Sequence, residues 1–100
     1  MYTERIKHLR SLLLIHSYIY YHRNDNLVSD EQWQEWAEEL KILQQTHVNI
    51  GWYDAEFQDW DGSTGMHLPR DFWVECKATQ LLNYRDRDEI KQRSISQIME

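Results

Sequence analysis

Cysteine, proline and glycine are all scarce in this sequence of 100 residues, which has one cysteine, one proline and three glycines. A single cysteine, Cys76, excludes an internal disulfide and is typical of a reducing compartment. Its aromatic surroundings favour a small packed hydrophobe over a nucleophile. The chain also has no Pro-rich linker, low-complexity tract or internal repeat. We therefore expect one domain spanning residues 1–100.

Long apolar runs are missing as well. The longest, residues 12–15, is far too short to cross a membrane. Charged side chains interrupt the N-terminal segment, so it does not have the apolar core of a signal peptide. These features predict a cytoplasmic protein without a membrane partner.

Basic residues are outnumbered: 11 Lys and Arg stand against 17 Asp and Glu, which gives a net charge of −6. A conventional duplex-DNA binder needs a basic stripe, and none is present. Direct binding to duplex DNA is therefore not expected. The scattered acids indicate a solvated surface. The alternative interpretation is an acidic nucleic-acid mimic, or a partner for a basic surface.

The common catalytic and metal-binding patterns are also missing. The five histidines include no pair four residues apart, the spacing that places two ligands on one helical face. The phosphate-binding pattern G-x-x-x-x-G-K-[ST] does not occur. No Ser or Cys has the neighbourhood of a known nucleophile. We expect no metal, and we interpret His16 as a packed or edge histidine of the first helix.

Helical periodicity dominates what is present. Apolar residues recur at helical spacing through residues 3–22, including Ile6, Leu9 and Leu13. A turn cluster follows at 24–26. Ser29 and Gln32 then match a capping box, and Val28 and Trp33 are placed for a hydrophobic staple. A second helix is predicted over 30–47, so the two helices should form an antiparallel hairpin.

The rest of the chain predicts shorter elements. A short helix is expected over 54–60, capped by Asp54, and a turn over 61–65. Pro69 can occupy the first position of a helix over 70–84. Residues 87–98 form either a last helix or a continuation of that one. The predicted fold is all-α: a hairpin (1–50), a Trp-rich loop segment (51–68), and one or two C-terminal helices (69–100) packed on the hairpin.

Residues 20–40 read YYHRNDNLVSDEQWQEWAEEL. This segment resembles the N-terminal helical-hairpin domain of bacterial NAD-dependent DNA ligases, which carries a Tyr/His pair, then D-x-x-Y-D, then a helix ending near E-L. The resemblance covers residues 9–50. The later segment DWDGSTGMHLPRDFW resembles small phage-encoded proteins related to that ligase, which would place the protein in the host cytoplasm.

In the ligase family this domain recognises the nicotinamide mononucleotide (NMN) half of NAD. The resemblance therefore implies a site for NMN or NAD with these contacting residues: Tyr20, Tyr21, Asp30, Trp33 and Gln34. Aromatic faces attract a cationic ring, and an acid can bind ribose hydroxyls. Two positions depart from the family pattern, because Trp33 replaces a Tyr and Gln34 replaces an Asp.

The ligase nucleophile is missing. It is a Lys in a K-x-D-G motif, and Asp59 stands at the corresponding position before Asp61 and Gly62. We therefore predict a non-catalytic chain with no catalytic residues of its own.

A second candidate surface surrounds the Gly-flanked turn at 62–65, where hydroxyls and backbone N–H groups could meet a ligand or partner. Its residues are Trp60, Ser63, Thr64 and His67. The alternative function is a protein-interaction factor, such as a phage-encoded modulator or inhibitor of a host enzyme.

Overall fold

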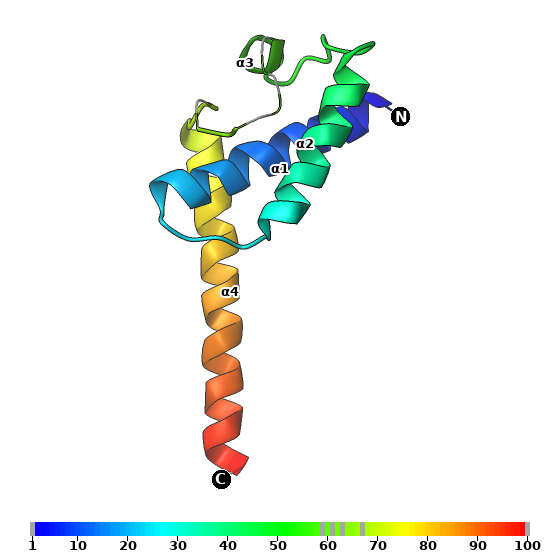
Figure 1. The fold of residues 1–100 in the computed structure, drawn as a ribbon. Coiled ribbons are helices and arrows are strands. Elements are labelled where there is room, and N and C mark those ends of the chain that lie inside the picture. Colours follow the sequence, from blue (N-terminus) through cyan, green and yellow to red (C-terminus); the bar gives the residue numbers. More distant parts are fainter. Residues whose placement is uncertain (1, 59, 61, 63, 67, 100) are drawn as a thin grey trace.

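The computed structural model of the chain describes residues 2–58, 60, 62, 64–66 and 68–99, with side chains as far as residue 87. All regular elements in these residues are helices: α1 (Tyr2–His22), α2 (Asp30–Gln44), α3 (Asp54–Gln58) and α4 (Phe72–Met99) (Figure 1). The predicted all-α fold is confirmed.

Helices α1 and α2 form the predicted hairpin. In Figure 1, α2 returns from the end of α1 toward the N-terminal end of that helix. The helical spacing of Ile6, Leu9 and Leu13 gives α1 a fully buried face, against which Ala37 and Leu40 of α2 pack. Burial of these side chains, rather than helix propensity, is what stabilises so short a pair of helices.

The cap of α2 forms where the Ser29 to Gln32 pattern predicts it. Ser29 has an extended backbone, and its Oγ accepts a hydrogen bond of 3.1 Å from the backbone N–H of Gln32. Asn24, in the turn before it, has the left-handed φ of 50° that asparagine tolerates. The cap therefore places the start of α2 close to the end of α1.

Helix α2 ends at Gln44, three residues before the predicted end at 47. The fully buried Arg10 of α1 explains this difference. Its guanidinium donates to Gln44 Oε1 at 2.8 Å and to the carbonyls of Val48 and Trp52, both at 2.7 Å. A fourth bond of 2.7 Å reaches Asp54 Oδ1. These bonds favour a path of the chain around Arg10 over another helical turn after Gln44.

Asp54 does not cap α3 as predicted but is the first residue of that helix. Its carboxylate binds the preceding turn instead, accepting from the backbone N–H of Ile50 at 2.9 Å and of Gly51 at 2.8 Å. Gly51 has a φ of +83°, which favours glycine. The bond from Ile50, then those from Gly51 and Arg10, lower the pKa of Asp54 to about 2.

Helix α4 begins at Phe72, so the predicted start directly after Pro69 is wrong. Asp71 caps it, because Asp71 Oδ1 accepts from the backbone N–H of Val74 at 3.0 Å. The helix continues without a break to Met99, which excludes a separate helix from residue 87 and confirms the alternative of a continuation.

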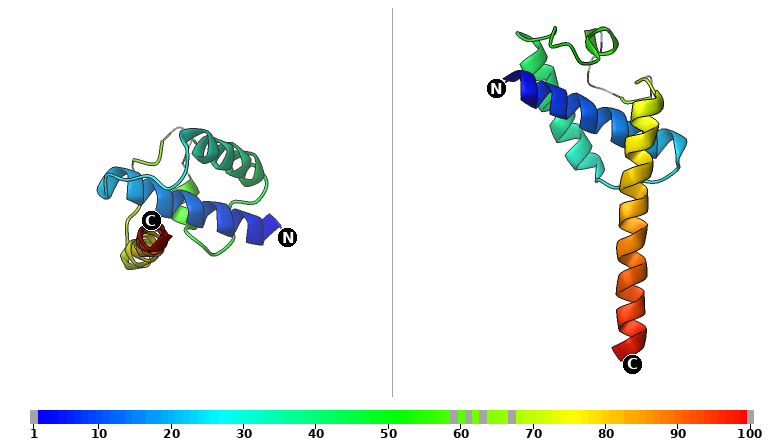
Figure 2. Two further views of the ribbon diagram at one scale, coloured as in Figure 1. Left: turned by 90° about the horizontal axis from the view of Figure 1, so that it is seen from below. Right: turned by 180° about the vertical axis from the view of Figure 1, so that it is seen from behind.

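The first half of α4 packs across α1. Ala78 and Leu82 are buried against Ile15 and Ile19 of α1, and Val74 joins the core that the hairpin shares with α3. The second half projects away from the other helices (Figures 1 and 2), and the described chain extends 57 × 24 × 22 Å. No helix in the described part of the chain combines the length and the apolar composition needed to cross a membrane.

Candidate functional site

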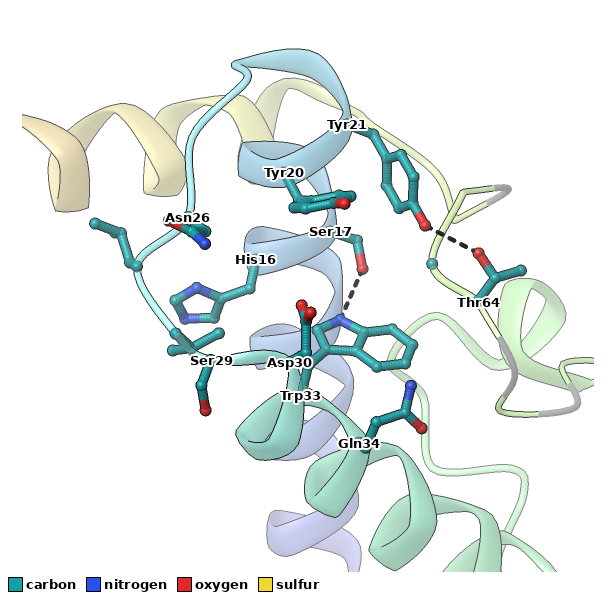
Figure 3. A pocket seen from close by; sticks show the side chains of 13 residues that line it. His16, Ser17, Tyr20, Tyr21, Asn26, Ser29, Asp30, Trp33, Gln34 and Thr64 are labelled. Atoms are coloured by element: carbon teal, nitrogen blue, oxygen red, sulfur yellow. Dashed lines mark hydrogen bonds between the residues drawn. The ribbon is translucent and has the colours of Figure 1, made fainter.

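A pocket of about 240 Å³ lies where the last turn of α1 meets the capped start of α2 (Figure 3). The loop after α3 closes one side of it through Thr64 and Gly65. The structure brings together in this pocket all five residues that the ligase resemblance implies: Tyr20, Tyr21, Asp30, Trp33 and Gln34. The hairpin does this because the short connection over 23–29 places the two helix ends side by side.

The last turn of α1 provides two exposed aromatic rings. Tyr20 and Tyr21 follow the buried Ile19, so the helix turns them away from the core. Their ring centroids are 4.9 Å apart and the planes are nearly perpendicular, at 86°. The edge of one ring therefore meets the face of the other, and both residues line the pocket.

The first turn of α2 provides the facing wall. Asp30 and Gln34 are exposed, and Trp33 is half-buried against the core. The indole Nε1–H of Trp33 donates to Ser17 Oγ of α1 at 3.2 Å. Because this bond satisfies the only polar group of the indole, Trp33 presents the pocket with an apolar ring.

The third wall comes from the loop after α3, through Thr64. Its Oγ1 shares a hydrogen bond of 3.1 Å with the Tyr21 hydroxyl and accepts another of 3.1 Å from the backbone N–H of Met66. Its carbonyl accepts from Trp60 Nε1 at 2.9 Å. These bonds hold the loop against both the end of α1 and the Trp60 ring.

Gly65 lets the loop approach α1 closely. A Cβ at this position would lie 2.0 Å from Ser17 Oγ, 2.7 Å from Ser17 Cβ and 3.1 Å from Trp33 Cζ2. No side chain fits in that space, so glycine is required. The sequence indicated a Gly-flanked turn that could meet a ligand or partner, but it did not indicate this close approach of Gly65 to α1.

Of the second candidate surface, the structure describes Trp60 and Thr64. Thr64 belongs to the pocket at the hairpin, and half-buried Trp60 packs edge-on against Trp33 at 6.3 Å and Phe57 at 5.3 Å. Trp60 therefore supports the pocket from behind. Ser63 and His67 lie outside the described residues.

His16 also lines the pocket, although the sequence indicated only a packed or edge histidine. Its ring centroid lies 5.5 Å from that of Trp36, at an interplanar angle of 35°. Burial lowers its pKa, so the imidazole is neutral at pH 7. Its contact with the pocket depends on the fold of the 26–29 loop, which no local pattern reveals.

Asp30 is the only side chain with a full charge among the residues described as lining the pocket. The other walls are aromatic rings, hydroxyls, amides and small apolar groups. Such a pocket suits a flat ligand that is neutral or positively charged. In the described part of the chain, His, Cys, Asp and Glu nowhere gather in the groups of three that would hold a metal ion.

Comparisons with known proteins found no relative of this chain. No family model matches the chain, and neither a curated protein nor a solved structure matches it.

Proposed function

We propose that this chain is a non-catalytic module that binds a nicotinamide nucleotide, NMN or NAD. The observation that supports this is the convergence of Tyr20, Tyr21, Asp30, Trp33 and Gln34 on one pocket. These five residues lie on two helices, and the ligase resemblance implies them independently of any contact between them. Convergence in one open pocket is what a retained ligand site requires.

The chemistry of the walls suits the nicotinamide half of the ligand. Aromatic faces attract the positively charged ring, and the Asp30 carboxylate can offset its charge or accept from a ribose hydroxyl. The pocket, at about 240 Å³, is smaller than the roughly 300–1,000 Å³ of drug-sized sites. It therefore takes the ring and ribose, while the phosphate stays at the solvent-exposed rim, away from Asp30.

Calorimetric titration with NMN and NAD tests the proposal, with thermal unfolding as a second readout. The Asp30→Asn variant removes the one charge among the described pocket residues and should weaken binding about fivefold, since an exposed pair of opposite charges contributes up to about 1 kcal/mol. Glu31→Gln is the matched control, because Glu31 is exposed next to Asp30 and is not among the described residues of the pocket. This variant should bind the ligand as the wild type does. Absence of both heat and thermal shift at millimolar NMN and NAD overturns the proposal.

A gain of affinity is a sharper test. Gln34→Asp restores the acid of the ligase pattern and adds a second carboxylate to the pocket wall. Binding of NMN should tighten about threefold or more, by the same attraction between opposite charges. A Gln34→Asp variant that binds more weakly than the wild type would show that the pocket does not hold a cation.

A second candidate function is the binding of a partner protein, and exposed apolar side chains on α4 favour it. Phe72, Leu81 and Tyr84 are 80%, 41% and 69% exposed, and the last two lie three residues apart on one helical face. The double variant Leu81→Glu/Tyr84→Glu should abolish capture of a partner from bacterial lysate without lowering the melting temperature. Equal capture by the wild type and this variant contradicts a role for the face.

A further inference from the structure

His16 stands between the pocket and the core. It precedes Tyr20 by one helical turn on α1 and lies beside the 26–29 loop (Figure 3). The ring of Trp36 of α2 also packs on it. The proposed contacts of a nicotinamide nucleotide do not use this histidine, although it lines the same pocket.

The two ring nitrogens of His16 are in different situations. Nδ1 is buried, and no hydrogen-bond partner reaches it from the described residues. A buried N–H without an acceptor is rare and costly, so the lone pair belongs on Nδ1 and the hydrogen on Nε2. Since Nδ1 is buried without a partner, Nε2 is the ring nitrogen that is left to form a hydrogen bond.

The charge around the ring favours a neutral donor. The residues that share the pocket with His16 come from α1, the 26–29 loop, the start of α2, and the Thr64–Gly65 segment; Asp30 is the one charged group among them. Burial lowers the pKa of the imidazole. Near pH 7 the ring therefore presents an N–H without adding a positive charge.

We propose that His16 is a specificity-determining residue whose Nε2–H donates to a carbonyl oxygen of the ligand, so that the site selects a carboxamide over a carboxylate. A carboxylate would bring a second negative charge into a pocket that holds Asp30 and no cation among its described walls. A neutral amide meets the donor without that repulsion. The inference rests on the proposed function, since nicotinamide carries its carboxamide on the ring.

Two pairs of probes test it by calorimetry: NMN against nicotinic acid mononucleotide, and nicotinamide against nicotinate. The wild type should bind each amide about tenfold more tightly than the matching acid. His16→Leu removes the donor and should weaken amide binding about tenfold, with little change for the acids. His16→Gln, whose amide N–H2 reaches the position of Nε2, should keep most of the amide affinity. His8→Leu, on an exposed face of α1, is the control and should leave binding unchanged.

The results separate the two proposals. Equal affinity for amide and acid, or unchanged amide binding in His16→Leu, overturns the role of His16 and leaves the nucleotide proposal standing. Selective binding of nicotinamide without binding of NMN or NAD overturns the nucleotide proposal alone. Absence of binding by all four probes and by NAD overturns both.

A measurement on the free protein checks the tautomer independently of any ligand. Long-range ¹H–¹⁵N correlation spectra at pH 7 should show a neutral His16 ring with the proton on Nε2. A charged ring, or a proton on Nδ1, overturns the inference. This measurement uses the wild type, so it remains decisive if a His16 variant fails to fold.

Discussion

Arg10 shows how much one buried side chain can organise. Its side chain is fully buried, and its guanidinium binds one carboxylate, one amide and two carbonyls that lie 34 to 44 residues further along the chain. The planar fork of the guanidinium suits several acceptors at once, which a lysine could not match. The loop between α2 and α3 takes its path from these bonds.

Removal of Arg10 should therefore be far more damaging than removal of a surface arginine. Arg10→Met leaves the acceptors that Arg10 holds without their donor and should lower the free energy of unfolding by about 3 kcal/mol or more. Arg5→Met is the control, because the pair between Arg5 and Glu39 is about 40% exposed and should contribute less than about 1 kcal/mol. Urea denaturation measures both, and similar losses would contradict the central role of Arg10.

Asp54 should make the protein sensitive to acid. Its pKa is about 2 in the folded state, against an ordinary value of 3.8, so the unfolded chain binds the proton more readily. The stability that Asp54 contributes is present above pH 4 and is lost as the pH falls toward 2. In urea denaturation between pH 5 and pH 3, Asp54→Asn should be less stable than the wild type at pH 5 and lose less stability on acidification. If the free energy of unfolding fell equally with pH in the wild type and in Asp54→Asn, Asp54 would not be the source of the acid sensitivity.

Each wall of the pocket is delivered by a different element, and each element is positioned for a different reason. The cap at Ser29 sets where α2 starts, and the buried face of α1 turns Tyr20 and Tyr21 outward. The loop wall depends on close packing of Gly65 on Ser17. The pocket is therefore as sensitive to the loop as to the hairpin.

Gly65→Ala should displace the loop wall. The added Cβ overlaps Ser17, which should lower stability by about 1–3 kcal/mol and weaken NMN binding. Ser17→Gly removes both Ser17 atoms that the new Cβ would meet, so the double variant should recover part of the loss relative to the sum of the single variants.

Gly51→Ala is the control for this cycle. Gly51 also needs glycine, but for its positive φ, and a Cβ added there would have no atom within 4 Å. Its effect should add to that of Ser17→Gly without coupling. Equal coupling for Gly51 and Gly65 would show that steric contact with Ser17 is not the cause.

At the scale of the whole molecule, α1 is the shared element. One face of α1 packs on α2 and α3, and a second face packs on α4. The apolar residues of α1 therefore surround much of the helix instead of forming one narrow stripe. The described side chains of α4 reach the core through Val74, Ala78 and Leu82. The pocket lies on the hairpin side and shares no described lining residue with α4.

A chain shortened to residues 1–87 should therefore retain its fold and its ability to bind the ligand. The free energy of unfolding, measured by thermal unfolding, should change by no more than about 0.5 kcal/mol, as for most surface changes. NMN should bind with the same affinity. A chain ending at residue 77 is the control, because loss of Ala78 and Leu82 uncovers Ile15 and Ile19 and costs several kcal/mol. A large loss in the 1–87 chain would show that the projecting half of α4 covers part of the molecule.

The sequence by itself determined the helices and the hairpin, while the five pocket residues were implied by a resemblance to the ligase pattern. The helices and the hairpin depend on spacing and capping within a few residues, so Ile6, Leu9 and Leu13 or Ser29 and Gln32 reveal them without any distant contact. Only the tertiary structure decided the loop wall of the pocket, the buried bonds of Arg10 and the position of His16. The Tyr21–Thr64 and Arg10–Asp54 contacts join residues 43 and 44 positions apart. No local pattern specifies such pairs, because they form only when burial of apolar side chains brings the helices together.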